Sequence, residues 1–254
     1  MKFGNTARQL ADTSHISRYS ARVLHDFLLA EQPVDCLELG FAHGANSGCI
    51  AAALDKLDRG HLTCVDTEPS LDFTPVIEQS LERLSLFRPR FGAPWRQLLQ
   101  LVFGKTAESR TRDDVGISCC YDVVFIDDSK NWATDGMAFF MADKLLRPGG
   151  WIVFDNHDRR YADALASGKD NSDSVSARAR SKDQIEQPNV AAIFHLLVAQ
   201  HPGYANFTIQ DHSWTRAQKT RGRRDIRYAR KSTLKSRFKR WASPLRNKPA
   251  IRGS

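Results

Sequence analysis

The chain has 254 residues, of which 41% are hydrophobic and 26% are charged, and its formal net charge is +8. This size and apolar content suit one α/β domain, or at most two, with a sizeable core. No stretch approaches the roughly 18 apolar residues that a membrane span needs, and residues 1–6 lack the pattern of a signal peptide. The five cysteines form no CxxC pair that would indicate zinc, so we expect free thiols and a cytoplasmic protein.

Apolar periodicity and turn residues predict the elements in chain order. A helix over residues 16–31 forms an N-terminal cap (residues 1–33), and a domain over residues 34–215 follows. The predicted strands cover residues 35–39, 61–66, 98–103, 121–127, 151–155 and 207–213, with a seventh near residues 225–230. The predicted helices cover residues 46–57, 73–87, 133–146 and 189–200, and residues 147–150 form a turn. Residues 158–188 are polar and aperiodic, which predicts an inserted loop, either a lid or a disordered segment.

Strands that alternate with helices in this rhythm predict the α/β class. We expect a Rossmann-like, doubly wound, mostly parallel seven-stranded sheet with helices on both faces. In sheets of this kind, ligands bind in the crevice outside the carboxyl ends of the strands. Candidate functional residues are therefore sought where the predicted strands end.

A glycine turn follows the first predicted strand. Residues 35–48 read Asp-Cys-Leu-Glu-Leu-Gly-Phe-Ala-His-Gly-Ala-Asn-Ser-Gly, so Gly40 and Gly44 bracket a loop that contains Phe41. Strand, glycine turn and helix together let backbone N–H groups and a helix N-terminus approach a polar ligand closely. The spacing Glu-x-Gly-x-x-x-Gly differs from the Gly-x-Gly-x-x-Gly of dinucleotide enzymes. Glu38, one residue before the strand ends, could hold the cation of an amino-acid-like ligand.

The second predicted strand ends in Asp66, which lies 22 residues after Gly44. An acid at this place in an open α/β sheet typically hydrogen-bonds ribose hydroxyls. The alternative is an aspartate that caps a helix or is simply solvated.

Three oxygen-bearing side chains follow the fourth and fifth predicted strands: Asp127, Asp155 and Asn156. Adjacent strands lie about 4.8 Å apart, so these side chains could surround one ion. Carboxylate and amide oxygens suit a hard cation such as Mg²⁺. The adjacent His157 could replace Asn156 as a ligand, although a solvated loop histidine is the simpler interpretation, and a strand-end aspartate can also merely cap a helix.

Such a cation could activate a hydroxyl group as a nucleophile. A neutral hydroxyl is a poor nucleophile at pH 7, and a divalent cation lowers its pKa and fixes its approach. A base must then take the proton. Lys130 lies three residues past Asp127, and a nearby dication would lower the lysine pKa, which is the direction that a base needs.

The glycine turn resembles the first motif of class I S-adenosylmethionine (SAM) methyltransferases. The later block, Asp127 with Lys130 and Trp132 and then Asp155-Asn156, resembles the cation-dependent O-methyltransferases of the catechol and caffeoyl-CoA type. It is also similar to the bacterial sugar and antibiotic O-methyltransferases. The resemblance covers residues 35–156. It implies a SAM site formed by Glu38, Gly40, Phe41, Gly44, Asp66, Thr106, Ala107 and Asp127, an Mg²⁺ site formed by Asp127, Asp155 and Asn156, and Lys130 as the catalytic base.

The charge is divided unevenly along the chain. Residues 1–215 hold 22 basic and 28 acidic residues, whereas residues 216–254 hold 15 basic residues and a single acid. Leu234, Phe238 and Trp241 are spaced for one helical face. This basic tail could form a last strand and an amphipathic helix on an anionic membrane at its inner face. It could also bind RNA phosphates or dock on the acidic body, and we expect disorder beyond about residue 243.

Three functions follow from these patterns. The first is a SAM- and Mg²⁺-dependent O-methyltransferase that acts on a small hydroxylated acceptor, either a sugar or a catechol-like molecule. The second is an RNA methyltransferase that captures its substrate with the tail, although residues 127–130 read Asp-Asp-Ser-Lys and not the Asn/Asp-Pro-Pro-Tyr typical of base-amino methylation. The third is a non-catalytic SAM-fold binding module.

Overall fold

The structure is a computed structural model, and it describes residues 17–40, 44–66, 84–87, 121–127, 132–160, 162–163, 181–210 and 214–221. The chain divides into two compact units, residues 1–222 and residues 223–254. All the elements below belong to the first unit. Within the part that is described, no helix is long and apolar enough to cross a bilayer.

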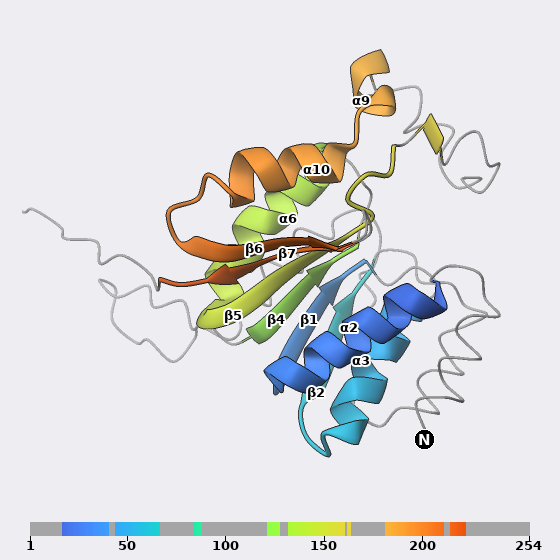
Figure 1. The fold of residues 1–254 in the computed structure, drawn as a ribbon, viewed down its shortest axis with the longest axis vertical. Helices are drawn as coiled ribbons and strands as arrows, with labels where there is room; N and C mark the ends of the chain where they lie inside the picture. The colour runs from blue at the N-terminus through green and yellow to red at the C-terminus, as the bar shows by residue number, and fades with distance from the viewer. Residues whose placement is uncertain are drawn as a thin grey trace, which may run out of the picture. The chain divides into compact units, whose positions relative to one another are not determined.

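A seven-stranded mixed sheet forms the centre of the first unit (Figure 1). The strands are β1 (Asp35–Leu39), β2 (His61–Val65), β3 (Leu84–Phe87), β4 (Tyr121–Ile126), β5 (Leu146–Asp155), β6 (Tyr204–Gln210) and β7 (Trp214–Lys219). Their spatial order is β3-β2-β1-β4-β5-β7-β6. The first five strands in this order are parallel, and β7 is antiparallel to both β5 and β6. The predicted Rossmann-like α/β fold is thereby confirmed.

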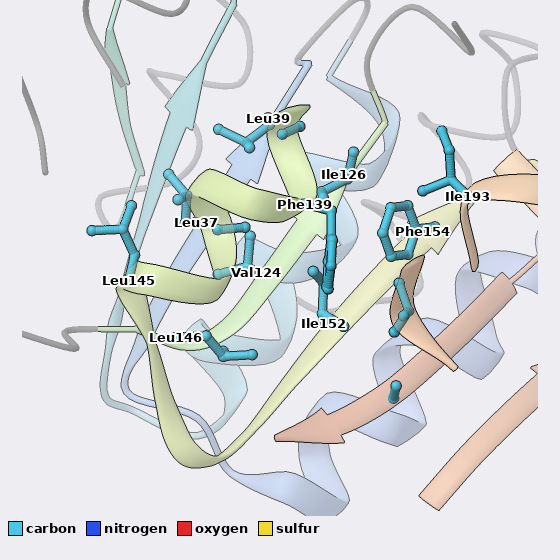
Figure 2. Packing of buried hydrophobic residues seen from close by; sticks show 14 of the residues in the cluster. Leu37, Leu39, Val124, Ile126, Phe139, Leu145, Leu146, Ile152, Phe154 and Ile193 are labelled. Carbon is cyan, nitrogen blue, oxygen red and sulfur yellow. The ribbon is translucent and has the colours of Figure 1, made fainter. Parts of the chain in front are cut away.

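Helices cover both faces of the sheet, as predicted. On one face lie α2 (Arg18–Glu31) and α3 (Ala45–Lys56), and on the other lie α6 (Trp132–Leu145) and α10 (Asn189–Ile193), which continues as the π-helix η1 (Phe194–Val198) (Figure 1). A short helix, α9 (Lys182–Glu186), precedes α10. Each face has its own apolar core, because strand residues alternate between the two faces. Figure 2 shows the α6 side, where Phe139 packs among Val124, Ile126 and Ile152.

The first helix begins and ends where its sequence indicates. Ser17 caps it, because the Ser17 hydroxyl accepts a hydrogen bond from the Ser20 backbone N–H at 3.0 Å. Gln32 ends it in a left-handed conformation with φ +51°, and Pro33 follows. The helix buries Ala21, Leu24 and Leu28 against α3 and the sheet. The helix predicted over residues 16–31 is confirmed within one or two residues, and residues 1–16 lie outside the described part.

Two strands of the structure lie where we predicted none. Residues 84–87, predicted as the end of a helix, form β3 and pair with β2, whereas the strand predicted at 98–103 lies outside the described residues. Residues 214–219, for which we predicted no strand, form β7, the last strand among the described residues, and the strand predicted near residues 225–230 lies outside the described part. The domain end predicted at residue 215 therefore falls inside a strand.

Three further segments differ in detail from their predictions. The turn predicted over residues 147–150 is an irregularity inside β5, where pairing with β4 skips from Leu146 to Trp151. The helix predicted over residues 189–200 changes to a π-helix at Phe194. The predicted loop over residues 158–188 contains α9, and most of the rest of it lies outside the described residues.

Candidate active site

Four candidate residues lie in one row at the carboxyl edge of the sheet. The parallel registers align Val65 of β2 with Leu39 of β1, then Ile126 of β4 and Phe154 of β5. The residues that come next are Asp66, Gly40, Asp127 and Asp155. Two backbone hydrogen bonds extend the row past the strands, from Gly40 N–H to the Val65 carbonyl at 2.9 Å and from Asp127 N–H to the Leu39 carbonyl at 2.8 Å. The predicted meeting of these strand ends is confirmed by the register.

The glycine turn that opens this edge requires glycine at both ends. Gly40 has φ +90° and Gly44 has φ +73°, a region that strains other residues. Gly44 begins α3, and its carbonyl accepts the first helical bond, from Gly48 N–H at 2.8 Å. The backbone N–H groups of the first turn of α3 lack intrahelical partners, which favours a polar or anionic group at this end. Phe41, predicted to contact the cofactor, lies outside the described residues.

The Glu38 side chain, two residues before Gly40, lies at the middle of a polar cluster. It is 1% exposed, and its Oε2 accepts hydrogen bonds from the Ser47 hydroxyl and, at 3.2 Å, from the Cys64 thiol. Burial raises the pKa of Glu38 to about 8, with smaller contributions from the charges of Asp127 and Asp66. At pH 7 the side chain is therefore mostly neutral. The sequence suggested that a Glu38 carboxylate could hold the cation of an amino-acid-like ligand; in the structure this side chain is buried and contacts Ser47 at the start of α3.

Asp127 and Asp155 meet at a third side chain that the sequence analysis did not single out. Asn46, in the first turn of α3, donates its Nδ2 to Asp127 Oδ2 at 2.7 Å and to Asp155 Oδ2 at 3.4 Å. Asn46 is 6% exposed. One amide nitrogen thus lies between two carboxylates that belong to neighbouring strands. In the sequence this residue is only an asparagine two positions after Gly44, and its partners depend on the fold.

Asn156 completes the group of oxygen-bearing side chains. It has φ +60°, a conformation that asparagine adopts more readily than most residues. Its backbone N–H donates to Asp155 Oδ1 at 2.7 Å, and its Nδ2 donates to Asp155 Oδ2 at 2.6 Å. The structure therefore brings together all three predicted metal ligands, Asp127, Asp155 and Asn156. Among the described residues, no group of three or more His, Cys, Asp or Glu side chains could hold a metal ion.

His157 is not the solvated loop residue that we expected. It is 3% exposed, and its ring packs edge-to-face against Phe194 and His195, with centroids 6.0 and 5.6 Å away. Its carbonyl accepts a hydrogen bond from Ala191 N–H at 3.1 Å. His157 therefore fixes the end of β5 to α10 and η1, on the face of the sheet opposite α3.

Of the remaining predicted site residues, the structure describes only Asp66. Asp66 follows β2 and is half-buried in the row described above. Thr106 and Ala107, predicted beside the adenine, and Lys130, predicted as the base, lie outside the described residues.

Comparison with known proteins finds a family match that includes the residues of this edge. Residues 37–157 match a family model described as a methyltransferase domain. The matched range contains Glu38, Gly40, Asp127 and Asp155. A search of curated protein sequences found no significant match.

Solved structures share the fold over most of the chain. The O-methyltransferase from Bacillus cereus, in complex with SAH, is 16% identical, with a TM-score of 0.54, and the match covers 85% of this chain and 91% of that one. The SAH-bound methyltransferase PaMTH1 from Podospora anserina is 13% identical, with a TM-score of 0.54 and coverage of 85% and 87%. TomG from Streptomyces achromogenes, an O-methyltransferase involved in tomaymycin synthesis and solved with SAM, is 18% identical, with a TM-score of 0.51 and coverage of 85% and 88%.

Proposed function

We propose that this chain is a class I SAM-dependent methyltransferase that methylates a hydroxyl oxygen of a small molecule with the help of a divalent cation, and the methyltransferase-domain match over residues 37–157 supports this. The acceptor that we propose is a sugar or a catechol-like molecule. One observation supports the proposal of a cation. Asp127 and Asp155 lie at the ends of neighbouring strands and contact the same amide nitrogen, that of Asn46.

The donor set at this edge fits a hard cation. Two carboxylates and the Asn156 amide offer the oxygen atoms that Mg²⁺ prefers, and no thiol lies among them. In the structure each carboxylate accepts hydrogen bonds from amide N–H groups. These N–H groups supply the positive partial charge that the two carboxylates need, and a cation would supply it more strongly. We therefore propose Asp127, Asp155 and Asn156 as ligands of Mg²⁺ or a similar ion.

The reaction requires that the acceptor lose a proton. The bond from the methyl carbon to the sulfonium sulfur breaks as the bond to the acceptor oxygen forms, and the hydroxyl proton leaves to a base. When bound, the cation would lower the hydroxyl pKa and orient the oxygen. Lys130 is our candidate for the base, because it follows Asp127 by three residues. The cofactor would lie against the turn from Gly40 to Gly44, with its ribose at Asp66.

The test uses SAM labelled on its methyl group. The purified protein is added, with Mg²⁺ or with excess chelator, to an extract from cells that lack this protein, and the extract is separated into small molecules, glycans and lipids, and RNA. We expect label among the small molecules or glycans that disappears with chelator and with Asp155→Ala. Label in RNA that survives chelator would contradict the proposal and would favour an RNA methyltransferase that uses residues 216–254 to capture its substrate.

The basic tail supports a secondary proposal about location. Its charge, 15 basic residues against one acid, suits an anionic membrane surface. We propose that the protein is cytoplasmic and binds the inner face of the membrane through this tail. Sedimentation of the full chain with vesicles that contain anionic lipid, and not with neutral vesicles, is the expected result; equal recovery with both would contradict it.

A further inference from the structure

We propose that Asn46 belongs to the cation site as a fourth protein ligand, through its side-chain oxygen Oδ1. The inference rests on the proposed function, because it needs a cation at Asp127 and Asp155. Its basis is the position of the Asn46 amide, which lies between the two carboxylates and contacts both.

The local backbone holds Asn46 in this position. Gly44, with φ +73°, ends the glycine turn, and the chain enters α3 at once, so Asn46 is in the first turn of the helix. The neighbouring Ser47 is fully buried and donates to Glu38. This hydrogen bond fixes the start of α3 over the end of β1. Asn46, one residue earlier, is thereby directed along the carboxyl edge toward β4 and β5.

An amide can serve both the empty and the loaded site. Without a cation, two carboxylates this close to one another need donors, and the Asn46 Nδ2 donates to both. A half-turn about the bond between Cβ and Cγ exchanges the amide nitrogen and oxygen in nearly the same positions. The oxygen would then face the space between Asp127 and Asp155. An amide oxygen is a good ligand for Mg²⁺ or Mn²⁺, whereas an N–H group directed at the cation would repel it.

The burial of Asn46 agrees with this role. Asn46 is 6% exposed, so its side chain is packed at this edge beside the two carboxylates. An amide that only donated hydrogen bonds would compete with the cation for the carboxylates. A ligand that turns its oxygen inward avoids this competition, and the site gains a neutral donor without a third negative charge.

Direct Mn²⁺ binding to the full chain tests the proposal without any acceptor. Bound Mn²⁺ is measured by the loss of its free electron paramagnetic resonance signal, in the wild type, Asn46→Ala and Asn46→Asp. We expect Asn46→Ala to bind Mn²⁺ about 10-fold or more weakly. Asn46→Asp keeps an oxygen but has no N–H group, and we expect it to bind at least as tightly as the wild type.

The outcomes separate this inference from the proposed function. If the wild type binds no Mn²⁺, the cation itself is excluded at this site. If the wild type binds and Asn46→Ala binds equally well, or if Asn46→Asp is as weak as Asn46→Ala, the ligand role is wrong. Asn189→Ala is the matched control, since Asn189 is a buried asparagine at the start of α10 on the other face of the sheet. Thermal unfolding in chelator verifies that each variant is folded.

Discussion

Asp127 and Asp155, the residues that end two neighbouring parallel strands, both direct an Oδ2 atom at the amide nitrogen of Asn46. Like charges in this arrangement repel unless donors or a cation compensate them. Asn46 and Asn156 provide such donors in the structure. This shared contact is why we propose a cation site at the two carboxylates.

The buried Glu38 predicts a specific pH dependence of stability. Its pKa is raised to about 8 when folded and is near 4.5 when exposed, so the folded protein keeps a proton that the unfolded chain releases between these values. The free energy of unfolding should therefore fall with rising pH in this window, by up to about 1.4 kcal/mol per pH unit from this group, and level off above pH 8. Urea unfolding from pH 4.5 to 8.5 measures it.

Glu38→Gln is the control for that slope, because glutamine has the same shape and no proton to lose. We expect the stability of the variant relative to the wild type to increase from pH 5 to pH 8. A difference between the two proteins that stays constant over this range would contradict the buried neutral carboxyl.

Asp143, at the end of α6, has two lysine partners that should differ greatly in their contributions. Lys219 is 6% exposed; its Nζ lies 3.2 Å from Asp143 Oδ1 and donates to the Leu146 carbonyl at 3.0 Å. Lys144 is closer, at 2.6 Å, but its side chain is 54% exposed. Burial alone would raise the pKa of Asp143, and the two ammonium groups together lower it below its usual value.

We expect Lys219→Met to lower the free energy of unfolding by about 3–5 kcal/mol, since it leaves a buried carboxylate without its buried partner. Lys144→Met should lower it by less than about 1 kcal/mol, because solvent screens an exposed pair. Urea unfolding at pH 7 compares the two variants. Equal losses would show that burial does not decide the strength of these pairs.

Substitutions of two glycines with nearly the same backbone conformation can distinguish the effect of backbone strain from that of a steric collision. Gly60 has φ +90° and Gly149 has φ +87°. An added Cβ at Gly60 would lie 2.6 Å from the Val34 carbonyl oxygen, the atom that accepts the hydrogen bond of His61 N–H between β1 and β2. At Gly149 an added Cβ would meet nothing within 4 Å.

Gly149→Ala should therefore cost about 1–2 kcal/mol, the strain of a left-handed conformation alone. Gly60→Ala should cost at least about 1 kcal/mol more, because the collision is with backbone and cannot be relieved by a side-chain rotation. Thermal and urea unfolding of both variants give the comparison. Similar losses would mean that the link between β1 and β2 adjusts freely.

Much of this fold was predictable because its strongest patterns are local. The strands over residues 35–39 and 121–126 form as expected, since apolar strands buried on both faces are short and distinct. Asp127 and Asp155 then lie side by side because β4 and β5, which are consecutive in the chain, are also neighbours in the sheet, as consecutive strands usually are.

The errors arose where tertiary contacts decide the structure. Residues 84–87, Leu-Ser-Leu-Phe, fit a helix continued from residue 73 and also fit the alternation of a strand, and pairing with β2 selects the strand. The strand β7 was not predicted, because its sequence is mostly polar. Its Arg216 stacks over Phe27, at 4.6 Å from the ring centroid, and its Lys219 is buried beside Asp143. Asn46 was missed because its partners are 81 and 109 residues away.

The most direct test of the central claim is the cation dependence of methyl transfer. The wild type and Asp155→Ala are treated with chelator, Mg²⁺ or Mn²⁺ is titrated back, and transfer of labelled methyl from SAM to the small-molecule fraction is measured. We predict that chelator abolishes transfer by the wild type, that the cation restores it in a saturable way, and that Asp155→Ala stays at least about 100-fold less active at any cation concentration. Full activity of the wild type in excess chelator would contradict the account.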